Sequence, residues 1–180
     1  KAMADRYLTL MDDENLEVGI VPCAMGGSSL INDWKRIYHA GTLYPTMVAR
    51  ALKAREWGEI ACLVGYQGEY EASESNPPSD LLYPRWLEAC YDLINSFRIE
   101  VENLALPAIM TVLGPNNTGD TYPNWTPMQQ YQSGMANSTD PKLRVVSASD
   151  LSTQADGIHL TADAAVTLGH RYADALYAMQ

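Results

Sequence analysis

The most informative stretch of this sequence reads Leu104-Ala-Leu-Pro-Ala-Ile-Met-Thr-Val-Leu113. It is an almost continuous apolar run that shows no alternation with polar residues. Such a run is typical of a strand that is buried on both faces, as strands are in a parallel sheet covered by helices. Short apolar runs at 17–23, 60–64 and 143–147 predict three further strands of the same kind.

Helices are predicted between these strands. The helical segments are expected at 2–11, 44–57, 80–97 and 127–135, and Thr161 is the expected N-cap of a last helix. Strict alternation of helix and strand indicates the α/β class, with a mostly parallel sheet between two layers of helices. In such a sheet the ligand site lies beyond the carboxyl ends of the strands, so functional residues are expected in the loops that follow them.

The composition excludes several classes of function. The chain has 180 residues, of which 47% are hydrophobic, enough for the one core of a single domain spanning 1–180. Its formal net charge of −10, with no compensating Lys/Arg cluster, opposes binding to nucleic acid. No apolar stretch approaches the ~20 residues that cross a bilayer, so no membrane partner is expected. The histidines and cysteines lack metal-binding spacing, so no metal is expected.

Two loops that follow predicted strands carry unusual residues. Gly26 and Gly27 precede Ser28 and let backbone N–H groups approach a ligand, although a tight turn explains the glycines as well. Gln67 and Glu69 follow the next strand. The Gln67 amide can donate to a developing oxyanion, whereas a solvated polar turn is the simpler interpretation. The first loop lacks the features of a P-loop or a dinucleotide fingerprint, so nucleotide binding is not predicted.

The loop after the last strand contains Asp156 and His159, a carboxylate three residues before a histidine. A histidine whose ring N–H is held by a carboxylate presents its other nitrogen as a base, which is the arrangement that activates a nucleophile. A helix-capping aspartate beside a surface histidine produces the same spacing, so the pair alone does not establish catalysis. His39, in an apparent loop, and His170, within the last helix, have no such setting.

In combination, the three loops resemble a known family. Gly-Gly-Ser at 26–28, Tyr-Gln-Gly-Glu at 66–69 and Asp-Gly-Ile-His-Leu at 156–160 are similar to motifs of the SGNH/GDSL hydrolases. The Gln-Gly-Glu version resembles the sialate O-acetylesterase-like branch, which includes the acetylxylan esterases of carbohydrate esterase family six. The resemblance implies a three-layer α/β/α sandwich with a flavodoxin-like sheet. It also implies removal of acetyl groups from sugar hydroxyls without a cofactor, in a secreted, periplasmic or virion-associated enzyme.

The same resemblance implies roles for individual residues. His159 would be the general base and Asp156 its orienter. The backbone N–H of Gly27 and the side-chain amide of Gln67 would form the oxyanion hole. Three further residues would support the site: Gly26, Ser28 and Glu69.

The nucleophile of this family has no counterpart between residues 1 and 180. In the family the serine belongs to a Gly-Gln-Ser-Asn block at the end of the first, central strand, and the sequence contains no such block. We therefore expect an N-terminally incomplete domain that lacks the first strand, with the serine upstream of Lys1 or supplied by a second polypeptide.

Two alternatives stay open. Ser28 or Ser29 would serve as the nucleophile if its hydroxyl lay within hydrogen-bond reach of His159. Otherwise the chain would be a catalytically inactive carbohydrate-binding module of the same fold, in which aromatic side chains stack on sugar rings. The candidates for stacking are Trp34, Tyr66, Tyr122 and Trp125.

Overall fold

The computed structural model describes residues 1–36, 43–73 and 82–180. In chain order the elements are α1 (Ala2–Met11), α2 (Leu30–Asp33), α3 (Tyr44–Ala54), β1 (Leu63–Gly65), α4 (Glu69–Ser73), α5 (Leu82–Glu100), β2 (Ala108–Val112), η1 (Gly119–Thr121), α6 (Trp125–Gly134), η2 (Met135–Asn137), β3 (Leu143–Ser147) and α7 (Ala162–Tyr177). His39 and Asp80, the residue at which the 80–97 helix was expected to begin, lie outside the described residues.

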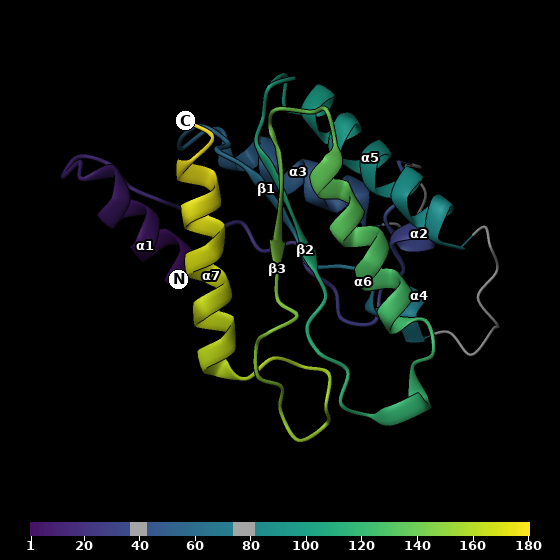
Figure 1. The fold of residues 1–180 in the computed structure, drawn as a ribbon. Helices are drawn as coiled ribbons and strands as arrows, with labels where there is room; N and C mark the ends of the chain where they lie inside the picture. The colour runs from purple at the N-terminus through teal and green to yellow at the C-terminus, as the bar shows by residue number, and fades with distance from the viewer. Residues whose placement is uncertain (37–42, 74–81) are drawn as a thin grey trace.

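The described strands form one parallel sheet in the order β1-β2-β3. Ala108 of β2 is in register with Leu63 on one side and with Leu143 on the other. All five residues of β2 are buried, as its uninterrupted apolar sequence predicts for the central strand of such a sheet. Figure 1 shows the strands running side by side, with helices on either side of them.

Successive residues of β2 point to opposite faces of the sheet and enter different apolar clusters. Ile109 packs in a cluster with Leu168 of α7. Met110 packs in a second cluster with Trp86 of α5 and Met128 of α6. The sheet is therefore covered by α7 on one face and by α5 and α6 on the other, which confirms the predicted α/β/α fold.

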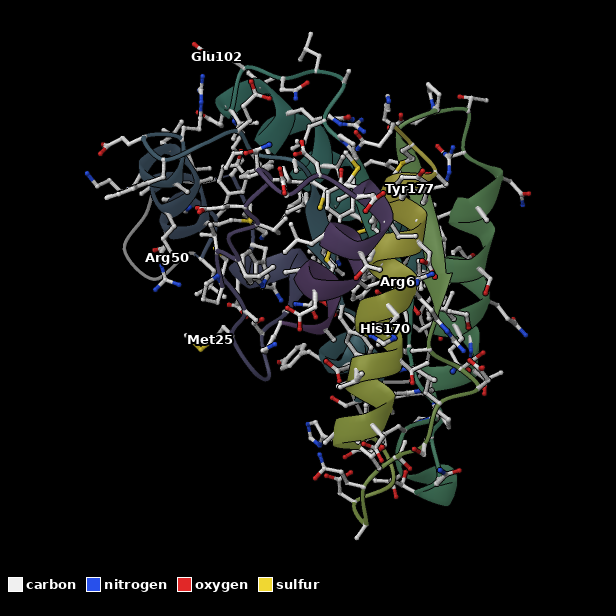
Figure 2. All side chains as sticks on the ribbon, turned by 90° about the vertical axis from the view of Figure 1, so that its left-hand side faces the viewer. Arg6, Met25, Arg50, Glu102, His170 and Tyr177 are labelled. Carbon is white, nitrogen blue, oxygen red and sulfur yellow. The ribbon has the colours of Figure 1, made fainter. Side chains whose placement is uncertain are left out.

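α1 is attached to the outer layer through α7. A Cβ at Gly169 would lie 3.0 Å from both the Cβ of Ala2 and the backbone nitrogen of Met3, so the glycine allows the two helices to approach closely. Arg6 Nε also lies 2.9 Å from Asp174 Oδ1. Figure 2 shows α1 lying along α7, with Arg6 next to that helix.

The prediction of a strand at 17–23 is wrong. This segment is irregular, no backbone–backbone hydrogen bond involves it in the described part of the chain, and Ile20 and Val21 are 54% and 41% exposed. A strand forms only where a neighbouring strand takes up its N–H and C=O groups, and no described strand pairs with this segment. Val18 and Cys23 still pack in clusters that contain residues of β1 or its preceding loop.

Other boundaries differ by a few residues. The strand expected at 60–64 is Leu63–Gly65, because pairing with β2 begins only where Leu63 N–H donates to Pro107 O at 2.9 Å. The run at 104–113 contributes only Ala108–Val112, and the helix expected at 44–57 ends at Ala54. Within the described ranges, no helix combines the length and apolarity needed to cross a bilayer.

Candidate active site

The loops that follow the three strands meet at one edge of the sheet. In Figure 1 the segments after β2 and β3 extend below the arrowheads. Gly114 N–H, after β2, donates to the hydroxyl of Tyr66, after β1, at 3.0 Å. Asn117 N–H, also after β2, donates to Gly157 O, after β3, at 2.9 Å. These bonds tie the three loops into one unit at the edge where an α/β sheet binds ligands.

His159 and Asp156 form the predicted pair. His159 Nδ1 lies 2.8 Å from Asp156 Oδ2, while Asp156 Oδ1 accepts the backbone N–H groups of Ile158 and His159, both at 3.0 Å. These two N–H groups, followed by the His159 side chain, lower the pKa of Asp156 to about 2, so its carboxylate is ionised at neutral pH. The His159 side chain is 63% exposed, and its Nε2 bonds to no described residue.

The turn between them has a backbone that only glycine adopts easily. Gly157 has φ of +82°, and a Cβ there would lie 3.1 Å from the carbonyl carbon of Asn117. The carbonyl groups that follow are held by Gln154: its backbone N–H donates to His159 O at 2.7 Å, and its side-chain amide donates to Leu160 O at 2.9 Å. The His159 backbone is thus held from both sides, which positions the exposed imidazole.

Gly26 and Gly27 lie in an exposed loop. Gly27 has φ of +69°, and no heavy atom lies within 4 Å of the position that a Cβ would take at either glycine. The neighbouring Met25 is 57% exposed and points away from the fold in Figure 2. The loop therefore presents its backbone to open space, as the sequence predicts.

Ser28 is buried and its hydroxyl is fully engaged. The hydroxyl donates to Met25 O at 2.8 Å and accepts from Trp34 Nε1 at 2.9 Å and from Gln67 Nε2 at 3.2 Å. One hydrogen and two lone pairs are all that a hydroxyl has, so Ser28 has no capacity left for His159.

Ser29 is also buried and committed elsewhere. Its hydroxyl caps α2 by accepting from Asn32 N–H at 3.1 Å, and it donates to Glu71 Oε1 at 2.8 Å. Neither serine forms a hydrogen bond with His159 within the described part of the chain. The geometry required for Ser28 or Ser29 as nucleophile is therefore not present.

Gln67 links two of the loops. Its Nε2 donates to Ser28 O at 3.0 Å as well as to the Ser28 hydroxyl, and its Oε1 accepts from Gly68 N–H at 2.8 Å. Its backbone carbonyl accepts from Gln132 Nε2 at 2.9 Å. The amide predicted to donate to an oxyanion thus also holds the Gly-Gly-Ser loop.

Glu69 begins α4, directly after this turn. Burial raises the pKa of its carboxyl, while the positive charge of protonated His159 acts in the opposite direction. Glu69 is therefore within range of an electrostatic interaction with His159. The structure thus brings together residues from the loops after β1 and β3, as expected from their order in the sequence.

Comparison with known proteins agrees with these motifs. A family described as carbohydrate esterase, sialic acid-specific acetylesterase matches residues 2–178. The chain belongs to this carbohydrate esterase family. A probable carbohydrate esterase of Arabidopsis thaliana is 29% identical over 175 residues, which cover 97% of this chain and 61% of the relative.

The three-dimensional comparison gives the same result. The X-ray structure of the Arabidopsis thaliana protein superimposes with a TM-score of 0.81 at 26% identity, covering 98% of this chain and 66% of that chain. The chain therefore spans less than two thirds of the relative's sequence and about two thirds of the chain in its solved structure. The fold and the family predicted from the three motifs are both confirmed.

Membership in a carbohydrate esterase family directs attention to the aromatic candidates for sugar contact. Trp125 is only 1% exposed and donates its Nε1–H to Gly114 O at 2.8 Å, so it cannot stack on a sugar ring. Tyr122 is tilted against Trp125 with ring centroids 5.8 Å apart. Burial raises the pKa of Tyr66 to about 12, and its hydroxyl accepts from Gly114. Trp34 is half-buried and bonded to Ser28.

Two buried polar residues of this member of the carbohydrate esterase family were not predicted from the sequence. Gln132 is 1% exposed, and its position between the buried Met128 of α6 and the buried Met135 of η2 is a signal that could have revealed it. Glu71 is also 1% exposed, but α4 is too short to show a periodic pattern, so its sequence carries no corresponding signal.

The described residues contain no group suited to binding a metal ion. No cluster of three or more His, Cys, Asp or Glu side chains with suitable geometry occurs among the described residues. Burial raises the pKa of Cys62 to about 11 and that of Cys90 to about 12, so both thiols are protonated at neutral pH.

Proposed function

We propose that this protein is a serine esterase that removes O-acetyl groups from a carbohydrate, with His159 as the general base. The observation that carries the proposal is the 2.8 Å contact between His159 Nδ1 and an ionised Asp156, with the imidazole exposed and Nε2 bonded to no described residue. A carboxylate at Nδ1 favours the tautomer in which Nε2 accepts a proton. Family membership supports an acetylated sugar as the substrate class.

The reaction follows from these positions. His159 Nε2 takes the proton of a serine hydroxyl as the serine oxygen bonds to the acetyl carbonyl carbon. The resulting oxyanion accepts from Gly27 N–H and from Gln67 Nε2. The Gln67 amide carries two hydrogens; one can serve both the carbonyl and the hydroxyl oxygen of Ser28, which leaves the other for the oxyanion. The ester bond to the sugar then breaks, and His159 returns the proton to the sugar oxygen. Water then attacks the acetyl carbon of the acetyl-enzyme as His159 Nε2 takes its proton. The bond to the serine oxygen breaks, His159 returns the proton to that oxygen, and acetate is released.

We place the serine outside residues 1–180, on a strand that precedes Lys1 or on a second polypeptide. Three observations support this. Ser28 and Ser29 are engaged elsewhere, β1 has a strand neighbour on only one side among the described residues, and the irregular segment 17–23 forms no backbone–backbone hydrogen bond in the described part of the chain. A strand between β1 and this segment would supply the missing pairing. Residues 1–180 then belong to a single esterase domain.

The test is acetate release by the full-length protein from an acetylated sugar and from an aryl acetate. His159→Ala should lower kcat by at least about 10³-fold, because the base that activates the serine is lost. His170→Ala removes an exposed histidine of α7 and serves as the matched control. Full activity in folded His159→Ala, or sugar binding without turnover in the wild-type protein, would refute the proposal.

A further inference from the structure

Glu71 has an unusual environment for a carboxyl group. It lies in α4, is 1% exposed, and uses one oxygen for two contacts with a distant part of the chain. Oε1 accepts the Ser29 hydroxyl at 2.8 Å and the Ile31 N–H at 3.2 Å. The other oxygen, Oε2, is buried with no hydrogen-bond partner among the described residues. Burying a carboxyl is costly, so a residue kept there is expected to have a specific role.

The contacts of Glu71 lie next to those of Gln67. Gln67 holds Ser28 through its amide, and Glu71, four residues later, holds Ser29 through its carboxyl. Two neighbouring residues of the Gly-Gly-Ser loop are thus attached at two points to the segment that begins at the end of β1. Ser29 also caps α2, so the attachment extends into that helix through Ile31.

This double attachment controls where the candidate oxyanion donors lie. Gly27 has φ of +69° and no heavy atom lies within 4 Å of its Cβ position, so packing at that position does not fix the loop. The Gln67 donor is fixed to Ser28 in turn. A displacement of about 1 Å in an oxyanion donor is enough to lower a rate substantially, because the bond is worth most at its transition-state distance.

We propose that Glu71 is a positioning residue which, through Ser29, holds the Gly26–Ser29 loop so that Gly27 and Gln67 donate to the same oxyanion. The proposal rests on the esterase function proposed above and adds a residue that does not touch the substrate. The contact requires an acceptor oxygen at Oε1 and makes no use of Oε2. Burial raises the pKa of Glu71 against the opposing effect of the Ser29 hydroxyl and nearby N–H groups, and a neutral carboxyl at this position keeps the same acceptor.

The test compares Glu71→Leu with Glu71→Gln in the full-length protein, using an aryl acetate. Glutamine keeps the acceptor for Ser29 and Ile31, whereas leucine removes it. We expect Glu71→Leu to lower kcat by about 10-fold to 100-fold, below the 10²–10³-fold cost of deleting a donor outright, with KM within about twofold. Glu71→Gln should recover most of kcat. Leu176→Ala, a core change in α7, is the control for a loss of stability alone and should leave kcat unchanged.

Each outcome separates this proposal from the esterase function. No acetate release by the wild-type protein refutes the function. An active wild-type protein and inactive His159→Ala, together with unchanged kcat in folded Glu71→Leu, refute only the role of Glu71. A rise in KM with an unchanged kcat in Glu71→Leu, or an equal fall of kcat in the Leu and Gln variants, refutes it too. If Glu71→Leu does not fold, Ser29→Ala tests the same contact: its kcat should fall at unchanged KM, and an unchanged kcat overturns the proposal.

Discussion

The Gln132 side chain joins α6 to the ends of two strands, and removing it should destabilise the fold. Its Oε1 accepts from Leu113 N–H at 2.9 Å, and its Nε2 donates to Gln67 O at 2.9 Å. Methionine has a similar length and volume but no amide. Gln132→Met therefore removes both bonds while leaving little empty space.

The expected loss of stability follows from the two backbone groups that Gln132→Met leaves without their hydrogen-bond partner. A buried polar group without a partner costs about 1–3 kcal/mol. Leu113 is fully buried, so its N–H would be left without any hydrogen-bond partner and would carry the whole of this cost. Gln67 is half-buried, so its carbonyl can form a hydrogen bond with water instead. We expect the free energy of unfolding to fall by about 2–4 kcal/mol. At about 2–4 °C per kcal/mol for a chain of this size, Tm should fall by about 4–16 °C.

Urea unfolding followed by tryptophan fluorescence measures this loss, with Trp125 as a buried reporter in the same region. Gln130→Met changes an exposed glutamine of the same helix and is the matched control, with an expected change within about 0.5 kcal/mol. If both variants unfold at the same urea concentration, the Gln132 bridge contributes no stability and the reasoning is wrong.

Two further predictions concern the His159 turn. Gly157→Ala forces a side chain into φ of +82° and within 3.1 Å of Asn117 and Thr118, so the free energy of unfolding should fall by about 1–3 kcal/mol; a urea midpoint equal to that of the wild-type protein would contradict this. The pKa of Asp156 is lowered from 3.8 to about 2, so this carboxylate stabilises the folded state above about pH 4, and the contribution is lost as the pH falls through about 2. Between these pH values the wild-type protein should lose more stability than Asp156→Asn, and parallel stability curves for the two proteins would show that the turn does not depend on this charge.

The parts of the fold that were predicted correctly have strong local patterns. β3 spans Leu143–Ser147 and α1 spans Ala2–Met11, as expected, and Thr161 caps α7 by accepting Ala164 N–H at 3.2 Å. The segment at 17–23 has an equally apolar pattern but no strand forms there, because pairing depends on a neighbour that its own residues do not specify.

In the candidate site, too, contacts between residues close in the sequence were predicted and contacts between distant residues were not. Asp156 and His159 are three residues apart, so one turn brings them together, and the spacing alone predicted their contact. The partners of Glu71 and Gln132 were not predicted, because each lies at least 19 residues away and no local pattern records such a partner. Only Gln132 had a local signal, its place between buried methionines.

By itself, the sequence determined that the chain is an α/β protein with a parallel sheet, and it correctly placed the motifs at 66–69 and 156–160 after strands, because periodicity and short-range spacing are local properties. Only the tertiary structure decided what those motifs hold. It committed Ser28 and Ser29 to Gln67 and Glu71, left His159 exposed beside an ionised Asp156, and gave 17–23 no strand to pair with among the described residues. The physical reason is that a hydroxyl or an amide bonds to whichever group the fold brings within about 3 Å, and that distance is set by packing between elements far apart in the chain.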